Sequence, residues 1–387
     1  MPKNRLSMLS GPGRVNWPKP PREACGGRRR GLCFRALPTR ERAAFLLRDQ
    51  ASYCAAMGSP LYAHLLERAA EDAGSGGPVF ALVEPFDAPN LRADALALRL
   101  MAAVHRLVLA GEAPRLAAHY PTAGGRAGID GAWAAFHGLV DEARDRLQPF
   151  VAQSCQTNEV GRCAALAFGF LELAERYRLP LRLLEVGSSA GLNLRLDHFH
   201  YGGGGKGFGP ADSPVDLSGL WLDAPPHFPE SLEVVERRGC DLRPIDIATS
   251  EGRLQLEASL WADQVKRLAR LRGAFKLAAR IPATVECASV DDWLPRQLAE
   301  PRRGATTVVF HSIVYEYFPE PVREAFHRAL DDAGARASAD APLAWLRFEA
   351  TPATRGYGTT LTTWPGAEER VVATAGAHGS DVRRPAA

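Results

Sequence analysis

The chain has 387 residues, of which 46% are hydrophobic and 24% charged; these values are typical of a globular protein with a sizeable core and exclude bulk disorder, a fibrous repeat and a small disulfide scaffold. The net charge of +3 is unevenly placed. Residues 1–40 carry ten basic groups and one acid, whereas the rest carries 37 basic and 43 acidic groups. A nucleic-acid-binding surface would extend into the folded part, so we predict no nucleic-acid partner.

The seven cysteines are scattered and form no Cys-x-x-Cys pair, which argues against a disulfide framework and a structural zinc site, so no metal is predicted. No apolar run is long enough to cross a bilayer, since the best candidate, Cys163 to Leu171, is bounded by Arg162 and Glu172. The arginines at 28–30 precede no apolar signal segment. The sequence therefore predicts a soluble cytoplasmic protein without a membrane partner.

Residues 1–40 contain five Gly and six Pro and predict a disordered basic arm. From Thr39, apolar residues recur at spacings of three and four in five successive stretches that end near Tyr177. These stretches predict an all-helical N-terminal region over residues 41–179. His105 lies close to the apolar stripe of the third predicted helix, where a partnered core histidine is expected.

From Pro180 onward, short apolar strands alternate with helices, which predicts an α/β domain over residues 180–387 with a Rossmann-like, mainly parallel sheet. The predicted strands cover residues 181–186, 234–242, 284–287, 306–311 and 343–348, and predicted helices cover 256–280 and 321–330. Two closing β-rich segments, 359–364 and 370–375, predict an antiparallel hairpin at one edge. A flexible surface loop is expected at the glycine-rich residues 202–209.

The densest motif lies at the end of the first predicted strand, where an acid is followed by a glycine turn and the start of a helix. Glycines let the backbone approach a ligand, and a helix N-terminus offers free N–H groups. The segment resembles the first motif of class I S-adenosylmethionine-dependent methyltransferases, (D/E)-x-G-x-G-x-G, with Ser189 in place of the middle glycine. The resemblance implies S-adenosylmethionine as cofactor, with Glu185 near its amino acid part. The implied cofactor contacts are Glu185, Gly187, Ser188, Ser189, Ala190, Gly191 and Asn193.

Two further positions fit a methyltransferase-like domain. Asp241 ends the second predicted strand, where a carboxylate can accept hydrogen bonds from both ribose hydroxyls. Because Asp241 lies 50 residues after Gly191, residues 198–231 would form an insertion; a turn residue is the equal alternative, and Glu236 is the second choice of acid. Ser289 follows the third strand and is predicted near the adenine, with a helix N-cap as the alternative for this cluster.

Three strings resemble one known family. They are Gln156-Thr157-Asn158-Glu159-Val160-Gly161-Arg162-Cys163, then Glu185 to Asn193 with Asp197 and Tyr201, and Val309-Phe310-His311-Ser312 with Tyr317 and Pro319. Together they closely resemble the domain of unknown function 2332 family, which is bacterial and has no established reaction. The likeness runs from about Phe45 to His378-Gly379. The chain departs from it at Cys287-Ala288, where Gly-Asp is usual.

The resemblance marks polar residues outside the glycine turn. Asn158, Glu159 and Arg162 suit a substrate or cofactor carboxylate, with a capped helix and solvated charges as the alternative, and Glu159 is also a candidate catalytic residue. Asp197 and Tyr201, four apart on one face of the helix expected after the turn, are predicted to contact substrate. His311 ends a buried strand at the carboxyl edge, where open α/β sheets bind ligands, and is the predicted general base.

Three functions remain open from the sequence. The first is an S-adenosylmethionine-dependent methyltransferase-like protein that acts on a small molecule, with the helical region capping the site; no methyl acceptor and no oligomeric state are indicated. The second is a serine hydrolase, because residues 187–191 also satisfy G-x-S-x-G with Ser189 as nucleophile and His311 or His378 as base. The helices that precede this motif argue against it. The third is a non-catalytic, Rossmann-like nucleotide-binding protein.

Overall fold

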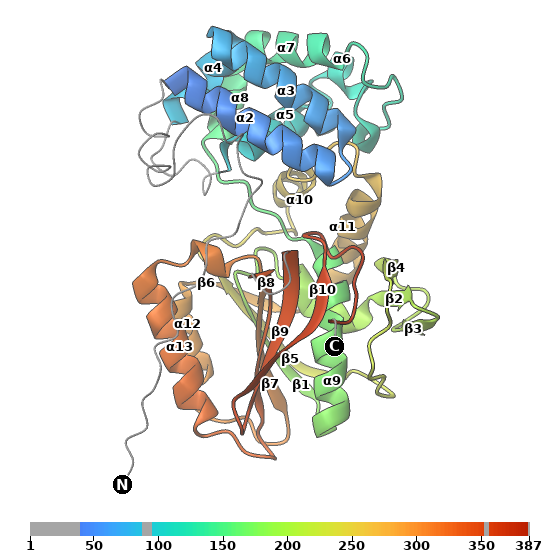
Figure 1. The fold of residues 1–387 in the computed structure, drawn as a ribbon, viewed down its shortest axis with the longest axis vertical. Coiled ribbons are helices and arrows are strands. Elements are labelled where there is room, and N and C mark those ends of the chain that lie inside the picture. Colours follow the sequence, from blue (N-terminus) through green and yellow to red (C-terminus); the bar gives the residue numbers. More distant parts are fainter. Residues whose placement is uncertain (1–38, 87–94, 352–355, 386–387) are drawn as a thin grey trace.

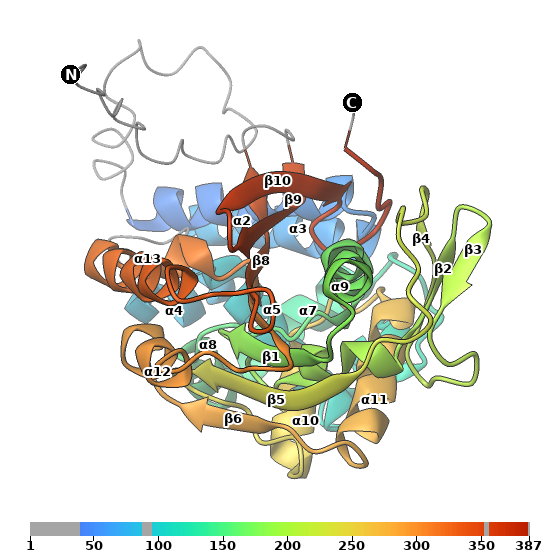
Figure 2. The ribbon, with the colours of Figure 1, turned by 90° about the horizontal axis from the view of Figure 1, so that it is seen from below.

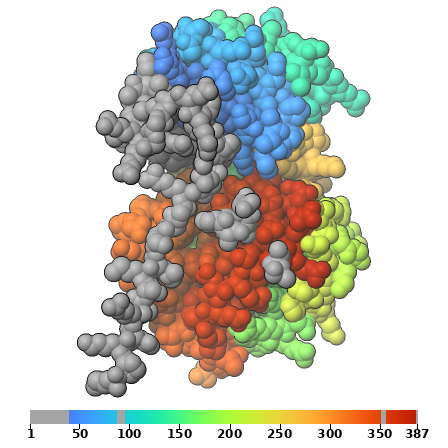
Figure 3. All heavy atoms as spheres, in the orientation of Figure 1, coloured from blue at the N-terminus to red at the C-terminus, as the bar shows by residue number. Residues whose placement is uncertain are grey.

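The computed structural model describes residues 39–86, 95–351 and 356–385, so nearly all of the predicted basic arm lies outside the described residues. The described chain forms two lobes, one helical and one built on a sheet (Figure 1). Figure 3 shows the blue helical lobe directly above the orange and red surface of the sheet domain.

The helical lobe is built from short helices that bury one apolar stripe each. Proline occupies the first turn of three of them, and Gly76 ends one in the left-handed conformation with φ of 80°, as helix ends favour. The helices are α2 (Thr39–Ala56), α3 (Pro60–Ser75), α4 (Pro78–Val83), α5 (Leu96–Leu109), α6 (Pro114–Ala117), α7 (Ala132–Glu142) and α8 (Arg144–Val151), with 3-10 turns η1 (Glu84–Phe86) and η2 (Pro121–Ala123).

A distant segment completes the helical lobe. Helix α10 (Ser250–Ala258), which lies between two strands of the sheet in the sequence, packs against α5, and Trp261 and Ala262 join the lobe's core. His105 is fully buried, and its ring nitrogens contact the Leu260 carbonyl oxygen at 2.9 Å and the Thr122 hydroxyl at 2.7 Å. The prediction of a partnered core histidine is confirmed.

Within the described residues, seven strands form the main sheet, in the order β10-β9-β8-β7-β1-β5-β6. The five from β8 to β6 are parallel, and the closing β9–β10 hairpin is antiparallel at one edge, as predicted. The strands are β1 (Leu181–Val186), β5 (Val234–Asp241), β6 (Thr284–Cys287), β7 (Thr306–Ser312), β8 (Leu343–Thr351), β9 (Gly356–Trp364) and β10 (Glu368–Ala375).

Helices cover both faces of this sheet (Figure 2). Because side chains alternate along a strand, Leu183 of β1 joins the core with α9 (Cys163–Tyr177) and α11 (Val265–Ala278), whereas Leu184 joins the core with α12 (Val290–Gln297) and α13 (Glu320–Gly334). The rings of Phe170 in α9 and Phe310 in β7 lie 5.2 Å apart. Helix α9 therefore belongs to the sheet domain, and the boundary predicted at residue 179 is too late: the helical lobe's first segment ends with α8.

The chain after the glycine turn differs from the predicted helix. It forms only the seven-residue 3-10 segment η4 (Leu192–His198) and then a small separate sheet of β2 (His200–Gly203), β3 (Lys206–Phe208) and β4 (Asp216–Trp221). Trp221 stacks on Tyr201 at 5.6 Å and donates its indole N–H to the Ala164 carbonyl of α9. The expected insertion is therefore present, but its glycine-rich part is mostly strand and not a flexible loop.

Candidate functional site

The strand order reverses between β1 and β7. From β1 the chain moves outward through β5 and β6 and then returns to β7 on the other side of β1. Glu185, near the end of β1, lies opposite Gly239 of β5 and Phe310 of β7. At such a reversal, the carboxyl ends of the strands diverge and leave a crevice for ligands. The predicted glycine turn and the string ending at Ser312 meet at this edge.

The glycine turn has the backbone that its sequence requires. Gly187 adopts φ of 66°, and a Cβ there would lie 2.5 Å from Cγ2 of Val314, which follows β7. Ser189 also has positive φ, 55°, the conformation that a middle glycine would adopt readily. Glycine at position 187 is therefore required partly because a side chain there would collide with Val314.

The N–H groups of the turn are largely used within the chain. Those of Ser188 and Gly191 bond to backbone carbonyl oxygens at 3.0 and 2.6 Å. Ser189 donates its N–H to the Asp241 carboxylate at 2.8 Å, and Leu192 donates to the Asn158 side-chain oxygen at 3.0 Å. The free helix N-terminus expected from the sequence is absent from this described segment, so the turn is poorly suited to hold a phosphate.

Three polar side-chain atoms of the turn have no hydrogen-bond partner among the described residues: Glu185 Oε2, Ser189 Oγ and Asn193 Oδ1. All three residues are at most 3% exposed. Burial raises the pKa of Glu185 well above its ordinary value, although a hydrogen bond with Asn193 and the charge of Arg195 oppose the rise. Burial therefore favours the protonated form of the Glu185 carboxyl, and this carboxyl lies in the same turn as two other buried polar groups without a partner among the described residues.

Asp241, the acid predicted to bind the ribose hydroxyls, is occupied by hydrogen bonds within the protein. The two carboxylate oxygens of Asp241 accept the N–H groups of Ser189 and Arg243, each at 2.8 Å, which is the turn role left open by the sequence. Glu236, the second choice, pairs with Arg182 of the neighbouring strand β1 at 3.0 Å. Beside Asp241, Leu242 is 70% exposed and offers an unusual apolar surface at this edge.

Ser289 lies at the N-cap of α12, which is the alternative that the sequence offered for this cluster. Its hydroxyl donates to Asp292 at 3.0 Å. Cys287, two residues earlier, is exposed, and its thiol lies 3.4 Å from the Leu242 carbonyl oxygen. The end of β6 therefore lies beside the loop that follows Asp241, but Ser289 is engaged within its own helix.

The segment 156–163 is hydrogen-bonded to the glycine turn, to the end of β7 and to the segment after β10. Besides the bond from Leu192 to Asn158, the short helix η3 (Val160–Arg162) sets Arg162 against the end of β7, where its guanidinium donates to the Ser312 carbonyl at 3.1 Å. Arg162 also donates to the Ala377 carbonyl at 3.1 Å. These two residues hold the glycine turn and the end of β7 in place, and none of their described bonds requires a substrate.

Glu159 forms a buried ion pair that the sequence did not reveal. Its carboxylate accepts from the Arg267 guanidinium at 2.6 Å and from the Gly161 N–H at 3.1 Å, and both charged residues are less than 7% exposed. Burial alone would raise the pKa of Glu159, but Arg267, foremost among nearby cations, lowers it to about 2. An ionised carboxylate occupied in this way is a structural anchor, so the catalytic role predicted for Glu159 is not supported.

His311 is fully buried at the end of β7, and its two ring nitrogens are both engaged. The Trp345 indole N–H donates to Nε2 at 3.0 Å, which makes Nδ1 the protonated nitrogen, and Nδ1 lies 2.7 Å from the Glu349 carboxylate. Its one lone pair is therefore occupied in this arrangement, and His311 would have to release Trp345 before it could act as the predicted general base. Glu349 also accepts the N–H of Val314 at 3.0 Å, so it fixes the loop after β7.

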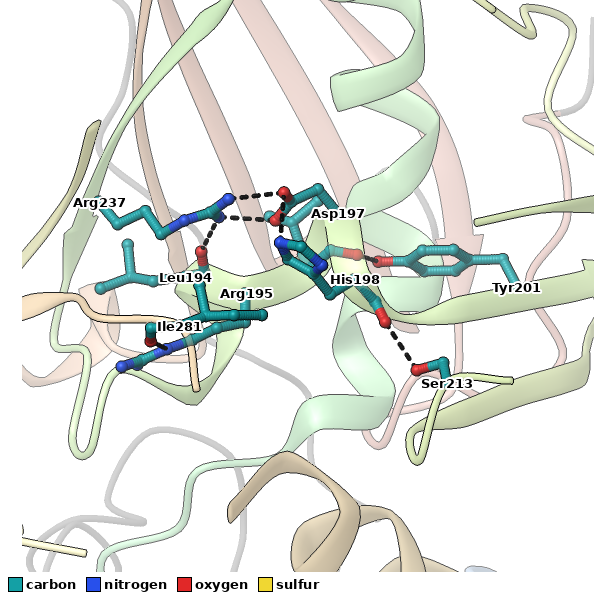
Figure 4. A network of polar contacts seen from close by, with 9 residues as sticks. Leu194, Arg195, Asp197, His198, Tyr201, Ser213, Arg237 and Ile281 are labelled. Atoms are coloured by element: carbon teal, nitrogen blue, oxygen red, sulfur yellow. Dashed lines mark hydrogen bonds and ion pairs between the residues drawn. The ribbon is translucent and has the colours of Figure 1, made fainter. Parts of the chain in front are cut away.

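Asp197 and Tyr201 do not share a helix face. Asp197 lies in the last turn of η4 and accepts two bonds from Arg237 at 2.6 Å each. Tyr201 lies in β2 and donates its hydroxyl to the Leu196 carbonyl at 2.7 Å (Figure 4). Both side chains are satisfied by their neighbours. In this arrangement they attach the small sheet to β5 and η4, and their predicted contact with substrate stays a prediction.

In the part of the chain that the structure describes, no helix is long and apolar enough to cross a membrane. Over the same residues, no cluster of three or more His, Cys, Asp or Glu side chains is arranged to hold a metal ion.

No curated protein and no solved structure matches the chain. The profile of one family, described as an uncharacterized protein conserved in bacteria (DUF2332), matches residues 44–384, which span both lobes. The strings that carried the resemblance converge in space, since the segment around Asn158 contacts both the glycine turn and the end of β7. The chain belongs to the DUF2332 family.

Proposed function

We propose that this protein is an S-adenosylmethionine-dependent methyltransferase-like enzyme that acts on a small molecule. The order of its five parallel strands, third-second-first-fourth-fifth along the domain, matches the Rossmann arrangement, and the glycine turn lies at the point where that order reverses. The observation that carries the proposal is the group of unpartnered, buried polar atoms of Glu185, Ser189 and Asn193 in this turn.

The chemistry of the turn favours a cofactor without phosphate. Its N–H groups are mostly bonded within the chain, and two carboxyl groups, those of Glu185 and Asp241, lie in or against it. A diphosphate would find few hydrogen-bond donors here, and nearby carboxylates would repel it. S-adenosylmethionine carries an ammonium and a sulfonium group and no phosphate, so it fits these residues better than ATP or NAD.

The residues present also suggest how such a cofactor would lie. Glu185 would accept a hydrogen bond from the amino group, and exposed Leu242 would support the purine. When bound, S-adenosylmethionine supplies an electrophilic methyl group. Transfer to a substrate requires alignment and exclusion of water, which a helical lobe over this edge of the sheet can provide.

Calorimetric titration of the full chain with S-adenosylhomocysteine, ATP and NAD tests the proposal. We expect binding of S-adenosylhomocysteine alone, with about 2.7 kcal/mol of stabilisation at 100 times its dissociation constant. Glu185→Gln should weaken this binding roughly 10- to 150-fold, as for a lost hydrogen bond to a charged group of about 1.5–3 kcal/mol. Glu175→Gln, on an exposed face of α9, is the matched control and should bind as the native chain. Binding of ATP or NAD in place of S-adenosylhomocysteine would contradict the proposal.

The same variant has a signature without ligand. Because the folded-state pKa of Glu185 is raised above its unfolded value near 4.5, its contribution to stability is fully present below about pH 4.5 and is lost as pH rises toward the folded pKa. Glu185→Gln removes this titration. The melting temperatures of the two proteins should therefore change differently between pH 4 and 9: as pH rises, the stability of the variant should increase relative to that of the native protein.

The hydrolase alternative requires a base beside Ser189. The Ser189 hydroxyl has no partner among the described residues, His311 is held by Trp345 and Glu349, and His378 packs edge-on against Trp261 at 5.3 Å. We therefore expect a fluorophosphonate probe to leave the folded protein unlabelled, as judged by intact-mass spectrometry. Labelling that disappears in Ser189→Ala would instead establish the hydrolase.

A further inference from the structure

A cavity of about 570 Å³, here called the flank cavity, borders the glycine turn at Ala190. It lies between η4, the loop after β5 and the end of α11. Its lining residues are Ala190, Arg195, Pro244, Ile245, Asp246, Ile247, Ala248, Arg253, Phe275, Ala278, Ala279, Ala283 and Val285. Its volume lies within the roughly 300–1,000 Å³ typical of small-molecule sites.

The fold explains why the flank cavity exists. In an open α/β sheet, the helix after the first strand ordinarily covers this face. Here the chain forms only η4, of seven residues, and then continues into the small sheet, so α11 and the segment after β5 cover this face in place of a full helix. The uncovered space is walled on its apolar side by Ile245, Phe275 and Val285.

The charged groups of the flank cavity are two guanidinium groups and one carboxylate. Arg195 is 5% exposed and donates to the carbonyl oxygen of Gly191 at 2.5 Å. It also donates to the carbonyl oxygen of Ile281 at 3.0 Å (Figure 4). Arg253 donates to those of Ile247 and Ala248 at 2.7 and 2.9 Å. Asp246 has one oxygen occupied by the Ala248 N–H at 2.9 Å.

These arginines have no ion-pair partner in the structure as described. Neither Arg195 nor Arg253 pairs with a carboxylate of any described residue; the charge of Glu185 raises the pKa of Arg195 but does not offset the effect of burial. Burial lowers the pKa of Arg195 to about 10, so the group is still a cation at pH 7. A desolvated cation bonded only to carbonyl groups is strongly stabilised by an anion.

We propose that the flank cavity is a second ligand site, which binds a small amphipathic carboxylate with its carboxylate on Arg195 and Arg253 and its apolar body against Phe275 and Val285. Because Arg195 also holds the Gly191 carbonyl, such a ligand is coupled to the glycine turn from the side. The site does not depend on which cofactor the turn binds.

Octanoate is the probe, with 1-octanol and octylamine as neutral and cationic analogues. Titration of the full chain by calorimetry should show one octanoate per chain, and the two analogues should bind at least about tenfold more weakly, since they lack the charge-assisted hydrogen bonds. Arg253→Gln should weaken octanoate about tenfold, and Ala278→Phe should fill the cavity and remove binding. Arg272→Gln, which lies on α11 and pairs with Glu257 away from the cavity, is the matched control. Thermal melts establish that each variant is folded.

Three results would overturn this inference. The first is no detectable binding at an octanoate concentration of about 10 mM, which would mean a dissociation constant too high for a specific site. The second is binding that Arg253→Gln and Ala278→Phe both leave unchanged, and the third is displacement of octanoate by S-adenosylhomocysteine, which would make the cavity part of the cofactor site. Octanoate binding in a chain that does not bind S-adenosylhomocysteine would support the flank cavity while rejecting the proposed cofactor. The two proposals therefore fail separately.

Discussion

Arg267→Met should lower the free energy of unfolding by about 3–5 kcal/mol at pH 7, because it leaves the Glu159 carboxylate buried without its cation. The residue is 6% exposed, and its guanidinium reaches Glu159 at 2.6 Å across 108 positions of sequence. Urea denaturation followed by tryptophan fluorescence measures the loss. A decrease below about 1 kcal/mol would show that the pair is solvated and contributes little.

The double variant and the pH dependence separate this cause from lost packing. Glu159→Gln with Arg267→Met removes both charges, so it should recover much of the loss. The folded pKa of Glu159, about 2, lies below its unfolded value near 4.5, so the pair's contribution is present above about pH 4.5 and is lost as pH falls toward 2. The difference between native chain and Arg267→Met should shrink over that interval.

Gly379→Ala should destabilise the protein by about 3 kcal/mol, because a left-handed residue and a close backbone contact coincide there. Gly379 has φ of 75°, and a Cβ would lie 2.0 Å from the Gly161 carbonyl oxygen, which cannot move without displacing η3. The measurement is the midpoint of thermal unfolding, converted to free energy.

Gly205→Ala is the matched control for this prediction. Gly205 has φ of 79°, but a Cβ there would meet nothing within 4 Å, so only the backbone preference of about 1 kcal/mol is lost. The difference between the two variants isolates the contact between residues 161 and 379. Equal losses would mean that the closing segment does not pack against η3.

The sequence predicted the sheet well because its signals are local. Strand β1 is buried along its whole length, and the predicted bounds 181–186 are those observed. The alternation of strands and helices likewise predicted a mainly parallel order, and the short spacing of the last two segments predicted their hairpin. Where the apolar period is ambiguous, prediction was wrong: every residue from Leu192 to Leu196 is buried, so the pattern could not distinguish a full helix from η4.

The bonding partners of the candidate-site residues could not be predicted from the sequence. Asn158, Glu159 and Arg162 each bond to a group far away in the sequence, which no local pattern reveals. His311 and Glu349 are 38 positions apart, and nothing local in β8 distinguishes Glu349 from a solvated strand-end acid. Sequence periodicity places a side chain on a face, whereas its hydrogen bonds are set by which strands become neighbours.

Because α10 and the residues after it pack into the helical lobe, this lobe cannot finish folding while its own first helices are being synthesised. Tyr62 and His105 direct their polar atoms at the Leu260 carbonyl, and Ser59 donates its hydroxyl to Asp263 at 2.6 Å. Until residue 263 has left the ribosome, these bonds to residues 260 and 263 cannot form, although α2 to α8 are already synthesised. At roughly 5–20 residues per second, the interval between residue 151 and residue 263 lasts on the order of 5–20 seconds. The helical lobe therefore cannot complete its core until α10 and residues 261–263 have been synthesised, and during that interval its unfinished surface is accessible to chaperones and proteases.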